Sequence, residues 1–224
     1  MSFGVAVFAL MAVWSLMTPL FSGPDEPSNF VRSAAVVRGE WVGDNVLPAP
    51  LKSYWTTTVN IDPQFGAANN IPWCFAPFSD RPGCGSRLED TQVTDIPAWT
   101  NMGRYPIASF FISGIGTVFG AQDLSVRAAR LMMSLACALL IALSVAAMKR
   151  RTTSSIGVLL AMLPGTVFLA STMNPSALEI CAAIALWTIM PSVIARDRTR
   201  FDLLAFCVAG ALLILTRAIG PVLY

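Results

Sequence analysis

The stretch ARLMMSLACALLIALSVAAM occupies residues 129–148 and is followed directly by the basic cluster Lys149-Arg150-Arg151. A helix needs about 20 predominantly apolar residues to cross the hydrocarbon core of a bilayer, and this stretch has that length. Basic residues at the end of a span favour the cytoplasmic side. The stretch therefore predicts a membrane-spanning helix whose carboxyl end faces the cytoplasm.

The composition of the whole chain agrees with a membrane protein. Of its 224 residues, 55% are hydrophobic and 12% are charged, and the mean hydropathy is +0.63. Soluble domains carry about 25% charged residues. The net charge of +2 is too small to indicate a nucleic-acid partner. The chain has no histidine, which excludes His-based triads and His metal sites and leaves carboxylates, Arg, Lys, Tyr and Cys as candidate reactive groups.

Four further apolar runs accompany this stretch. They cover residues 3–21, 156–173, 180–195 and 203–217, and Pro164-Gly165 interrupts the second of them. The first run is either a signal peptide or a retained helix. The absence of Lys and Arg before it and its near-spanning length favour the retained helix. The pattern predicts an all-α polytopic membrane protein with about five transmembrane helices.

The charge pattern sets the expected orientation. The basic clusters at residues 149–151 and 196–200 are separated by two spans, so they share one side, which the positive-inside rule makes cytoplasmic. Counting back puts the N-terminus in the cytoplasm and the long first loop outside. We expect a multi-pass protein of the plasma membrane with a first transmembrane helix (1–21), an external loop with interfacial helices (22–128) and a transmembrane bundle (129–224).

The external loop is rich in Pro, Gly, Asn and Trp. Residues 28–39 predict a helix that Ser28 caps and Gly39 ends, with its apolar residues on one face, as is typical of a helix lying on a membrane. Short strands are expected near residues 54–61. The apolar stretch 105–119 is short for a span and reads as an interfacial or re-entrant segment.

The cysteines divide by environment. Cys137, Cys181 and Cys207 lie in apolar runs, where cysteine acts as a small buried hydrophobe. Cys74 and Cys84 lie in a polar segment with Pro and Gly, where they either close a short disulfide loop or remain free thiols. The external side expected for this segment favours the disulfide.

Asp25 and Glu26 stand side by side between two prolines, directly after the first apolar run. Two carboxylates at a membrane boundary mark either a solvated helix exit or the rim of an active site. Arginine binds phosphate oxygens through a bidentate fork, and a carboxylate can take a proton from an attacking hydroxyl. A lipid phosphate substrate would therefore suit the charged residues expected on the outer face, which are Asp25, Glu26, Arg127, Arg130, Glu179 and Arg217.

Several of these residues also have a purely structural interpretation. Arginines at the start of a span are typical interfacial anchors that snorkel. Glu179 suits the first turn of a helix, and Asn174 or Ser176 would cap that helix. Arg217 lies between an apolar run and an apolar tail, and an arginine near the membrane is a functional candidate by default.

Four short motifs of the chain resemble a family of bacterial polytopic membrane proteins known as domain of unknown function 2142. They are, in order, Pro24-Asp25-Glu26-Pro27 with Arg32 after it, Arg104-Tyr105-Pro106, residues 174–179 (Asn-Pro-Ser-Ala-Leu-Glu), and Arg217 followed by Pro221. Asn29 stands where the family has a histidine-like position. Members of that family are longer, so the resemblance implies that this chain is a truncated, N-terminal portion.

That family in turn resembles the GT-C class of membrane glycosyltransferases, which use polyprenyl-phosphate-linked sugars. The resemblance implies that Asp25 is the general base, with Glu26 as its neighbour or substitute. Arg217, with Arg127 or Arg130, would hold the donor phosphate. The residues implied to bind substrate are Arg32, Arg127, Arg130, Asn174, Glu179 and Arg217.

The implied reaction is a single displacement at the anomeric carbon, with a cell-envelope glycan or lipid as acceptor. Membrane lipids are the other expected partners, and no cofactor or metal is indicated. The alternatives are a non-catalytic transport or assembly component of envelope glycan synthesis, and an inactive truncated relative. A transporter usually places polar groups on broken helices at the midplane, whereas no charge lies beside Pro164-Gly165, so the enzyme is favoured.

Overall fold

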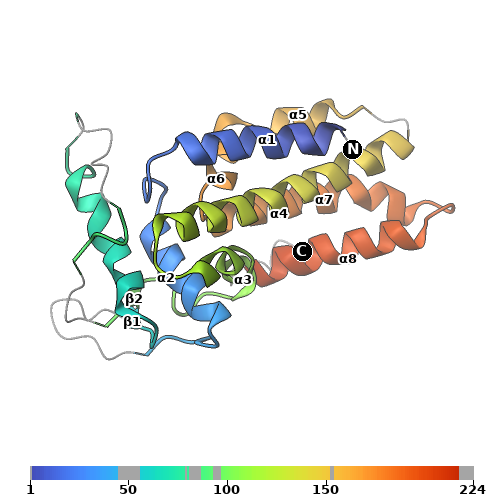
Figure 1. Ribbon diagram of the computed structural model, residues 1–224. Coiled ribbons are helices and arrows are strands. Elements are labelled where there is room, and N and C mark those ends of the chain that lie inside the picture. Colours follow the sequence, from blue (N-terminus) through green and yellow to red (C-terminus); the bar gives the residue numbers. More distant parts are fainter. Residues whose placement is uncertain are drawn as a thin grey trace.

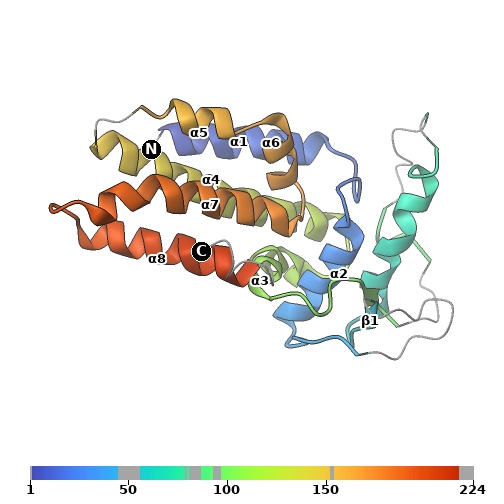
Figure 2. The same ribbon diagram turned by 180° about the vertical axis from the view of Figure 1, so that it is seen from behind.

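The computed structural model describes residues 2–44, 56–78, 80, 87–92, 97–151 and 154–216. Four helices run side by side and form the body of the molecule (Figures 1 and 2). They are α1 (Ser2–Met17), α4 (Asp123–Arg150), α7 (Pro175–Ile194) and α8 (Arg200–Thr216). Their shared core is apolar and includes Met11, Cys137, Ile141, Leu178 and Ala209. The prediction of a mostly helical membrane-type fold is confirmed.

Two helices in the described part of the chain, α4 and α7, are long and apolar enough to cross a membrane. The apolar helices at Phe3–Met17 and Ala108–Phe119 are shorter. Both long helices begin earlier than their apolar runs, α4 at Asp123 and α7 at Pro175. The count of five spans stays a prediction.

The run at 156–173 forms two short helices instead of one span. They are α5 (Ile156–Ala161) and α6 (Pro164–Ala170), and α6 packs beside α1 and α7. Proline restricts the preceding residue to extended backbone, and Leu163 has ψ 156°. Pro164 then takes the first helical turn, where its missing N–H costs nothing. The interruption predicted at Pro164-Gly165 is confirmed.

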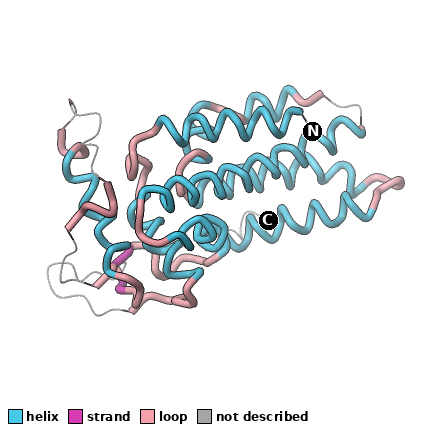
Figure 3. The backbone as a smooth tube through the Cα atoms, viewed as in Figure 1, coloured by secondary structure: helices cyan, strands magenta, loops and turns pink. Residues whose placement is uncertain are grey.

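The remaining elements gather at the end of the bundle where α1 leads into α2 (Glu26–Val37) (Figure 1). They are η1 (Pro63–Cys74), α3 (Ala108–Gly114), η2 (Ile115–Phe119), and the strands β1 (Thr57–Thr58) and β2 (Trp99–Thr100), which pair antiparallel. Figure 3 shows how little of the backbone is strand. A second apolar cluster, with Phe21, Phe30, Phe65, Val126 and Met173, joins this end to the bundle.

Helix α2 differs from the expected interfacial helix because it is buried on nearly every side. All residues from Ser28 to Val36 are buried, and α2 packs between α3 and η1. The helix also begins two residues before Ser28, with Asp25 at the N-cap. Gly39, with φ +90°, follows the end of the helix as expected for a stop signal.

Helices α3 and η2 have one buried and one exposed face. Gly114 lies against the Ser33 carbonyl and Gly116 against the backbone of Ala129, so both glycines allow a close approach to neighbouring helices. The opposite face exposes the apolar side chains of Ile107, Phe111, Ile115, Val118 and Phe119. This pattern is compatible with the interfacial segment expected for residues 105–119.

Both basic clusters lie at the other end of the bundle. Arg150 pairs with Asp202, and Arg151 donates to Asp197 at 2.6 Å, which joins the end of α4 to the α7–α8 connection. The two clusters thus lie at one end of the bundle, while their shared side of a membrane stays a prediction. Their cytoplasmic assignment remains a prediction.

Candidate functional site at the junction of α1, α2 and α4

The acidic pair Asp25-Glu26 lies where the chain turns from α1 into α2. Asp25 is the N-cap of α2 and has a left-handed backbone, with φ 55° and ψ 15°. Aspartate tolerates this region better than most residues. Its side chain is exposed and forms no capping hydrogen bond, nor any ion pair within the described residues. Asp25 therefore presents an uncommitted carboxylate.

Glu26 has the opposite environment, because its side chain is fully buried against Arg130. Oε1 accepts from Arg130 Nε at 2.7 Å and from the Met173 amide at 3.3 Å. Oε2 accepts from Arg130 Nη2 at 2.7 Å and from the Gly23 amide at 3.2 Å. Four donors on two oxygens leave little capacity for a substrate, which argues against Glu26 as a substitute base.

Arg130 is equally committed to internal contacts. Beyond Glu26, its Nη1 donates to the carbonyls of Ser15 and Thr18 at 3.0 and 2.9 Å, and its Nη2 donates to Pro19 at 2.8 Å. All five guanidinium N–H groups thus have acceptors. Three of these acceptors are carbonyls at the carboxyl end of α1, where a cation is favoured. Arg130 therefore joins α1 to α2 and has no donor left for a phosphate.

The turn between α6 and α7 completes this junction. Asn174 caps α7 by accepting from the Ser176 amide at 2.9 Å, and its Nδ2 donates to the Pro24 carbonyl at 3.4 Å. A Cβ on Gly23 would lie 2.9 Å from Thr172 Cβ, so only glycine permits this approach. The expected cap by Asn174 is confirmed. The structure thus brings the motif at 174–179 directly against Pro24-Asp25-Glu26-Pro27.

Arg127 lies one helical turn before Arg130 on α4. It is half-buried and donates from Nη1 to the Leu16 carbonyl at 3.2 Å. Its other N–H groups have no acceptor within the described ranges, so Arg127 is the arginine of this junction that retains donors for an anion.

Arg32 lies within the buried helix α2. Its Nη1 and Nη2 donate to the carbonyls of Glu40, Trp41 and Tyr105 at 3.2, 2.6 and 3.2 Å, and its guanidinium lies 5.9 Å from the Phe110 ring centre. Burial lowers the pKa of Arg32 to about 10, because desolvation disfavours the charged form. Arg32 and Tyr105 come from two motifs of the family resemblance, and this contact links them.

Other predicted site residues are placed differently or fall outside the described ranges. Glu179 is half-buried in the second turn of α7 rather than the first, and it contacts other groups. Arg217 lies outside the described residues, so its expected place at the outer end is untested. Cys84 does too, and the Cys74–Cys84 disulfide stays a prediction.

Sequence reasoning missed several participants in this junction. The carbonyls of residues 15, 18 and 19 and the amides of Gly23 and Met173 are backbone groups, which leave no mark in the sequence. The pair Gly23-Pro24 is a sequence signal for the turn itself, because Gly-Pro pairs mark turns and loops. Among the described residues, no cluster of Cys, Asp and Glu is arranged to hold a metal ion.

The junction has a buried part and a solvent-accessible part. The buried part is the Glu26–Arg130 pair, whose hydrogen-bonding groups are all used. The solvent-accessible part holds the Asp25 carboxylate and the remaining donors of Arg127. A carboxylate and a guanidinium at a membrane boundary can accept a proton and bind an anion, respectively.

Comparison with protein families matches residues 8–224 to the family described as predicted membrane protein, DUF2142. No curated protein and no solved structure matches the chain significantly. The family match covers nearly the whole chain, from the first turns of α1 through the junction and the bundle. The chain therefore belongs to the DUF2142 family of predicted membrane proteins.

Proposed function

We propose that this chain acts as a GT-C-like membrane glycosyltransferase. It would transfer a sugar from a polyprenyl-phosphate donor to a cell-envelope glycan or lipid on the external face of the plasma membrane. Asp25 would deprotonate the acceptor hydroxyl as that hydroxyl attacks the anomeric carbon, and the polyprenyl phosphate would leave. No other residue of the junction is assigned to the proton transfer.

The observation that carries the proposal is the contrast between Asp25 and Glu26. Glu26 uses both oxygens to fix the start of α2, whereas Asp25 projects outward with no partner in the described part of the chain. A general base needs access to its substrate, and it needs a rigid backbone to hold it in reach. The buried pair next to it supplies that rigidity.

The donor phosphate needs cationic donors near this carboxylate. Of the arginines expected to hold it, Arg130 has no N–H group left and Arg217 is not among the described residues. Arg127 keeps most of its donors and lies at the same end of α4. We therefore assign the phosphate to Arg127, with Arg217 as a further candidate.

The orientation of the site is part of the proposal. The junction lies at the end of α4 opposite the Arg150–Asp202 and Arg151–Asp197 pairs (Figure 1). If the basic end is cytoplasmic, as the positive-inside rule favours, the junction faces the outside. Lipid-linked sugars presented on that face would reach Asp25 without crossing the protein.

The test is the substitution Asp25→Asn. Asparagine tolerates the same left-handed backbone, so the change removes the base and leaves the N-cap geometry. Membranes containing the chain would be given a radiolabelled polyprenyl-phosphate sugar, and label transferred to glycan or lipid would be counted. We expect a loss of about 10²- to 10⁴-fold, the usual contribution of a general base.

The matched control is Asp90→Asn, which changes another exposed aspartate, in the segment between η1 and β2. It should transfer sugar at the wild-type rate. Equal transfer by wild type and Asp25→Asn would refute the base assignment.

The second candidate is a non-catalytic membrane component of envelope glycan synthesis. This candidate is favoured by Glu26, Arg130 and Arg32, whose hydrogen bonds are all made within the protein. These contacts hold α2 and its neighbouring elements on the bundle. Such a component would show no sugar transfer in the same membranes, while its loss would still reduce the envelope glycan.

A further inference from the structure

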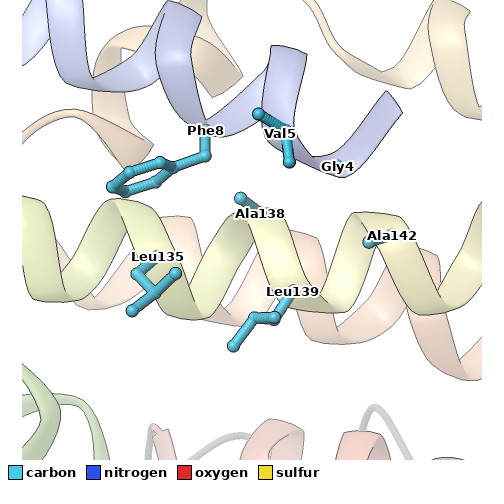
Figure 4. A pocket seen from close by; sticks show the side chains of 7 residues that line it. All are labelled: Gly4, Val5, Phe8, Leu135, Ala138, Leu139 and Ala142. Carbon is cyan, nitrogen blue, oxygen red and sulfur yellow. The ribbon is translucent and has the colours of Figure 1, made fainter. Parts of the chain in front are cut away.

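An apolar groove runs between α1 and α4 and is open on one side (Figure 4). Its volume is about 240 Å³, and its lining is Gly4, Val5, Phe8, Leu135, Ala138, Leu139 and Ala142. Figure 4 shows the Phe8 ring lying between the two helices, with Ala138 pointing toward α1. No side chain of the lining carries a polar atom, so the groove offers nothing to water or to a headgroup.

The groove is bounded by a close contact of the two helices. A Cβ on Gly4 would lie 2.8 Å from the Ala142 Cβ, so the glycine brings α1 against α4 at that end. Beside this contact, Val5 and Leu139 are more than half exposed, at 63% and 56%. The groove is therefore open sideways, to the surroundings of the bundle.

Arg127 lies on the same stripe of α4 as the groove. Residues 127, 131, 135, 138 and 142 follow one another at spacings of three or four, which places them along one face of the helix. With a rise of 1.5 Å per residue, Arg127 lies about 12 Å from Leu135 along the helix axis. Arg127 also contacts the Leu16 carbonyl of α1, so it closes the outer end of the same α1–α4 seam.

We propose that this groove holds the prenyl chain of a lipid phosphate whose headgroup is bound by Arg127; the choice of a prenyl phosphate rests on the proposed function. The arrangement gives an anion-binding group near the end of α4 and, about 12 Å further along the same helix face, an apolar groove. The groove lies between two helices, and its volume of about 240 Å³ accommodates a segment of one hydrocarbon chain. A partner helix is a less suitable occupant, because the exposed residues Val5 and Leu139 are larger than the residues typical of helix contacts in membranes.

The test uses photoactivatable lipids and the full chain in nanodiscs. A polyprenyl phosphate with a diazirine in its chain is the main probe. The same prenyl chain without phosphate, and a diazirine phosphatidylglycerol, are the other arms. Labelled peptides are identified by mass spectrometry and normalised to folded protein recovered by size-exclusion chromatography. We expect the prenyl phosphate to label residues 4–8 and 135–142 roughly tenfold more than the prenol, as one bound phosphate implies. It should also label them more than phosphatidylglycerol, whose phosphate is a diester attached to two acyl chains.

Three variants make the test specific. Arg127→Gln keeps an N–H for the Leu16 carbonyl but removes the charge, and should reduce labelling to the level of the uncharged prenol. Val5→Trp places a larger side chain at the groove and should reduce labelling roughly tenfold, because it occupies space that the prenyl chain would fill. Val13→Trp changes an equally exposed valine of α1 outside the groove, at 60%, and should label like wild type.

Equal labelling of the groove by all three lipids, unaffected by Arg127→Gln, would overturn the proposal and show ordinary lipid contact. This result is separable from the catalytic test, because labelling needs no sugar transfer. Selective labelling with no effect of Asp25→Asn on transfer would support the groove and refute the base. Transfer that depends on Asp25 without selective labelling would refute the groove alone.

Discussion

The Glu26 carboxylate and the Arg130 guanidinium form two hydrogen bonds of 2.7 Å, and neither side chain has any exposed surface. The two residues are 104 positions apart, so the pair fixes the start of α2 on the body of α4. Asp25 is the residue immediately before this fixed point. Its position at the surface is therefore set by a contact in which it takes no part.

The first prediction concerns this buried pair. Removing one partner leaves the other charge buried without compensation, which typically costs about 3–5 kcal/mol. Glu26→Gln and Arg130→Met should each lower the unfolding free energy by an amount of this order, measured by denaturant titration in detergent. The double variant should cost clearly less than the sum of the single variants.

Arg127→Gln is the control, because Arg127 is half-buried and its described contact is one carbonyl. It should change stability far less than Arg130→Met. Strictly additive costs of the two single variants would show that the pair contributes no coupling.

The second prediction concerns glycines. A Cβ on Gly116 would lie 2.2 Å from the Ala129 amide nitrogen, and backbone cannot move aside as a flexible side chain can. Gly116→Ala should therefore separate η2 from α4 and lower the thermal midpoint markedly. Gly157→Ala, with nothing within 4 Å and a helical position, should be neutral or stabilising by up to about 1 kcal/mol. Similar midpoints for the two variants would contradict this packing.

The third prediction separates the two contacts of Asn174. Asn174→Asp keeps the cap on the Ser176 amide but removes the donor to the Pro24 carbonyl, whereas Asn174→Ala removes both. Loss of a cap costs about 1 kcal/mol. We expect the order wild type, Asp, Ala in thermal stability. An Asp variant as unstable as the Ala variant would show that the Pro24 contact, rather than the cap, dominates.

The fourth prediction tests orientation. In a chain without native cysteines, Trp73→Cys and Lys149→Cys place thiols at opposite ends of the molecule, both at exposed positions. A membrane-impermeant maleimide added to intact cells should label the cysteine at 73 and spare the one at 149. Labelling of both sites after the membrane is opened is the control. The reverse pattern in intact cells would place the junction in the cytoplasm.

The parts of the fold that local pattern decides were predictable. The span at 129–148, the break at Pro164 and the cap by Asn174 each follow from a few adjacent residues, and the structure has all three. The shared end of the two basic clusters followed from counting spans. These features depend on propensity and periodicity, which a single sequence displays.

The parts decided by long-range contacts were not predictable. Residues 28–39 read as a surface helix because their apolar residues share a face, yet α2 is covered on its polar side as well. On that side, Ser33 forms a hydrogen bond of 2.7 Å with Ser113, which is 80 positions away in the chain. The same reason hid the burial of Glu26, whose partners lie on α4 and before α7. Adjacent carboxylates look equivalent in sequence, and only the tertiary contacts separate Asp25 from Glu26.

The contact between Glu26 and the Met173 amide has a consequence for how the chain is made. These two groups are 147 positions apart, and Arg130 lies between them in the chain. At ribosomal rates of about 5–20 residues per second, Met173 is synthesised roughly 7–30 seconds after Glu26. During that interval water must solvate the Glu26 carboxylate, because its donors on Arg130 and Met173 do not yet both exist. The complete hydrogen-bond set of Glu26 can therefore form only after α4 and the turn before α7 have been synthesised.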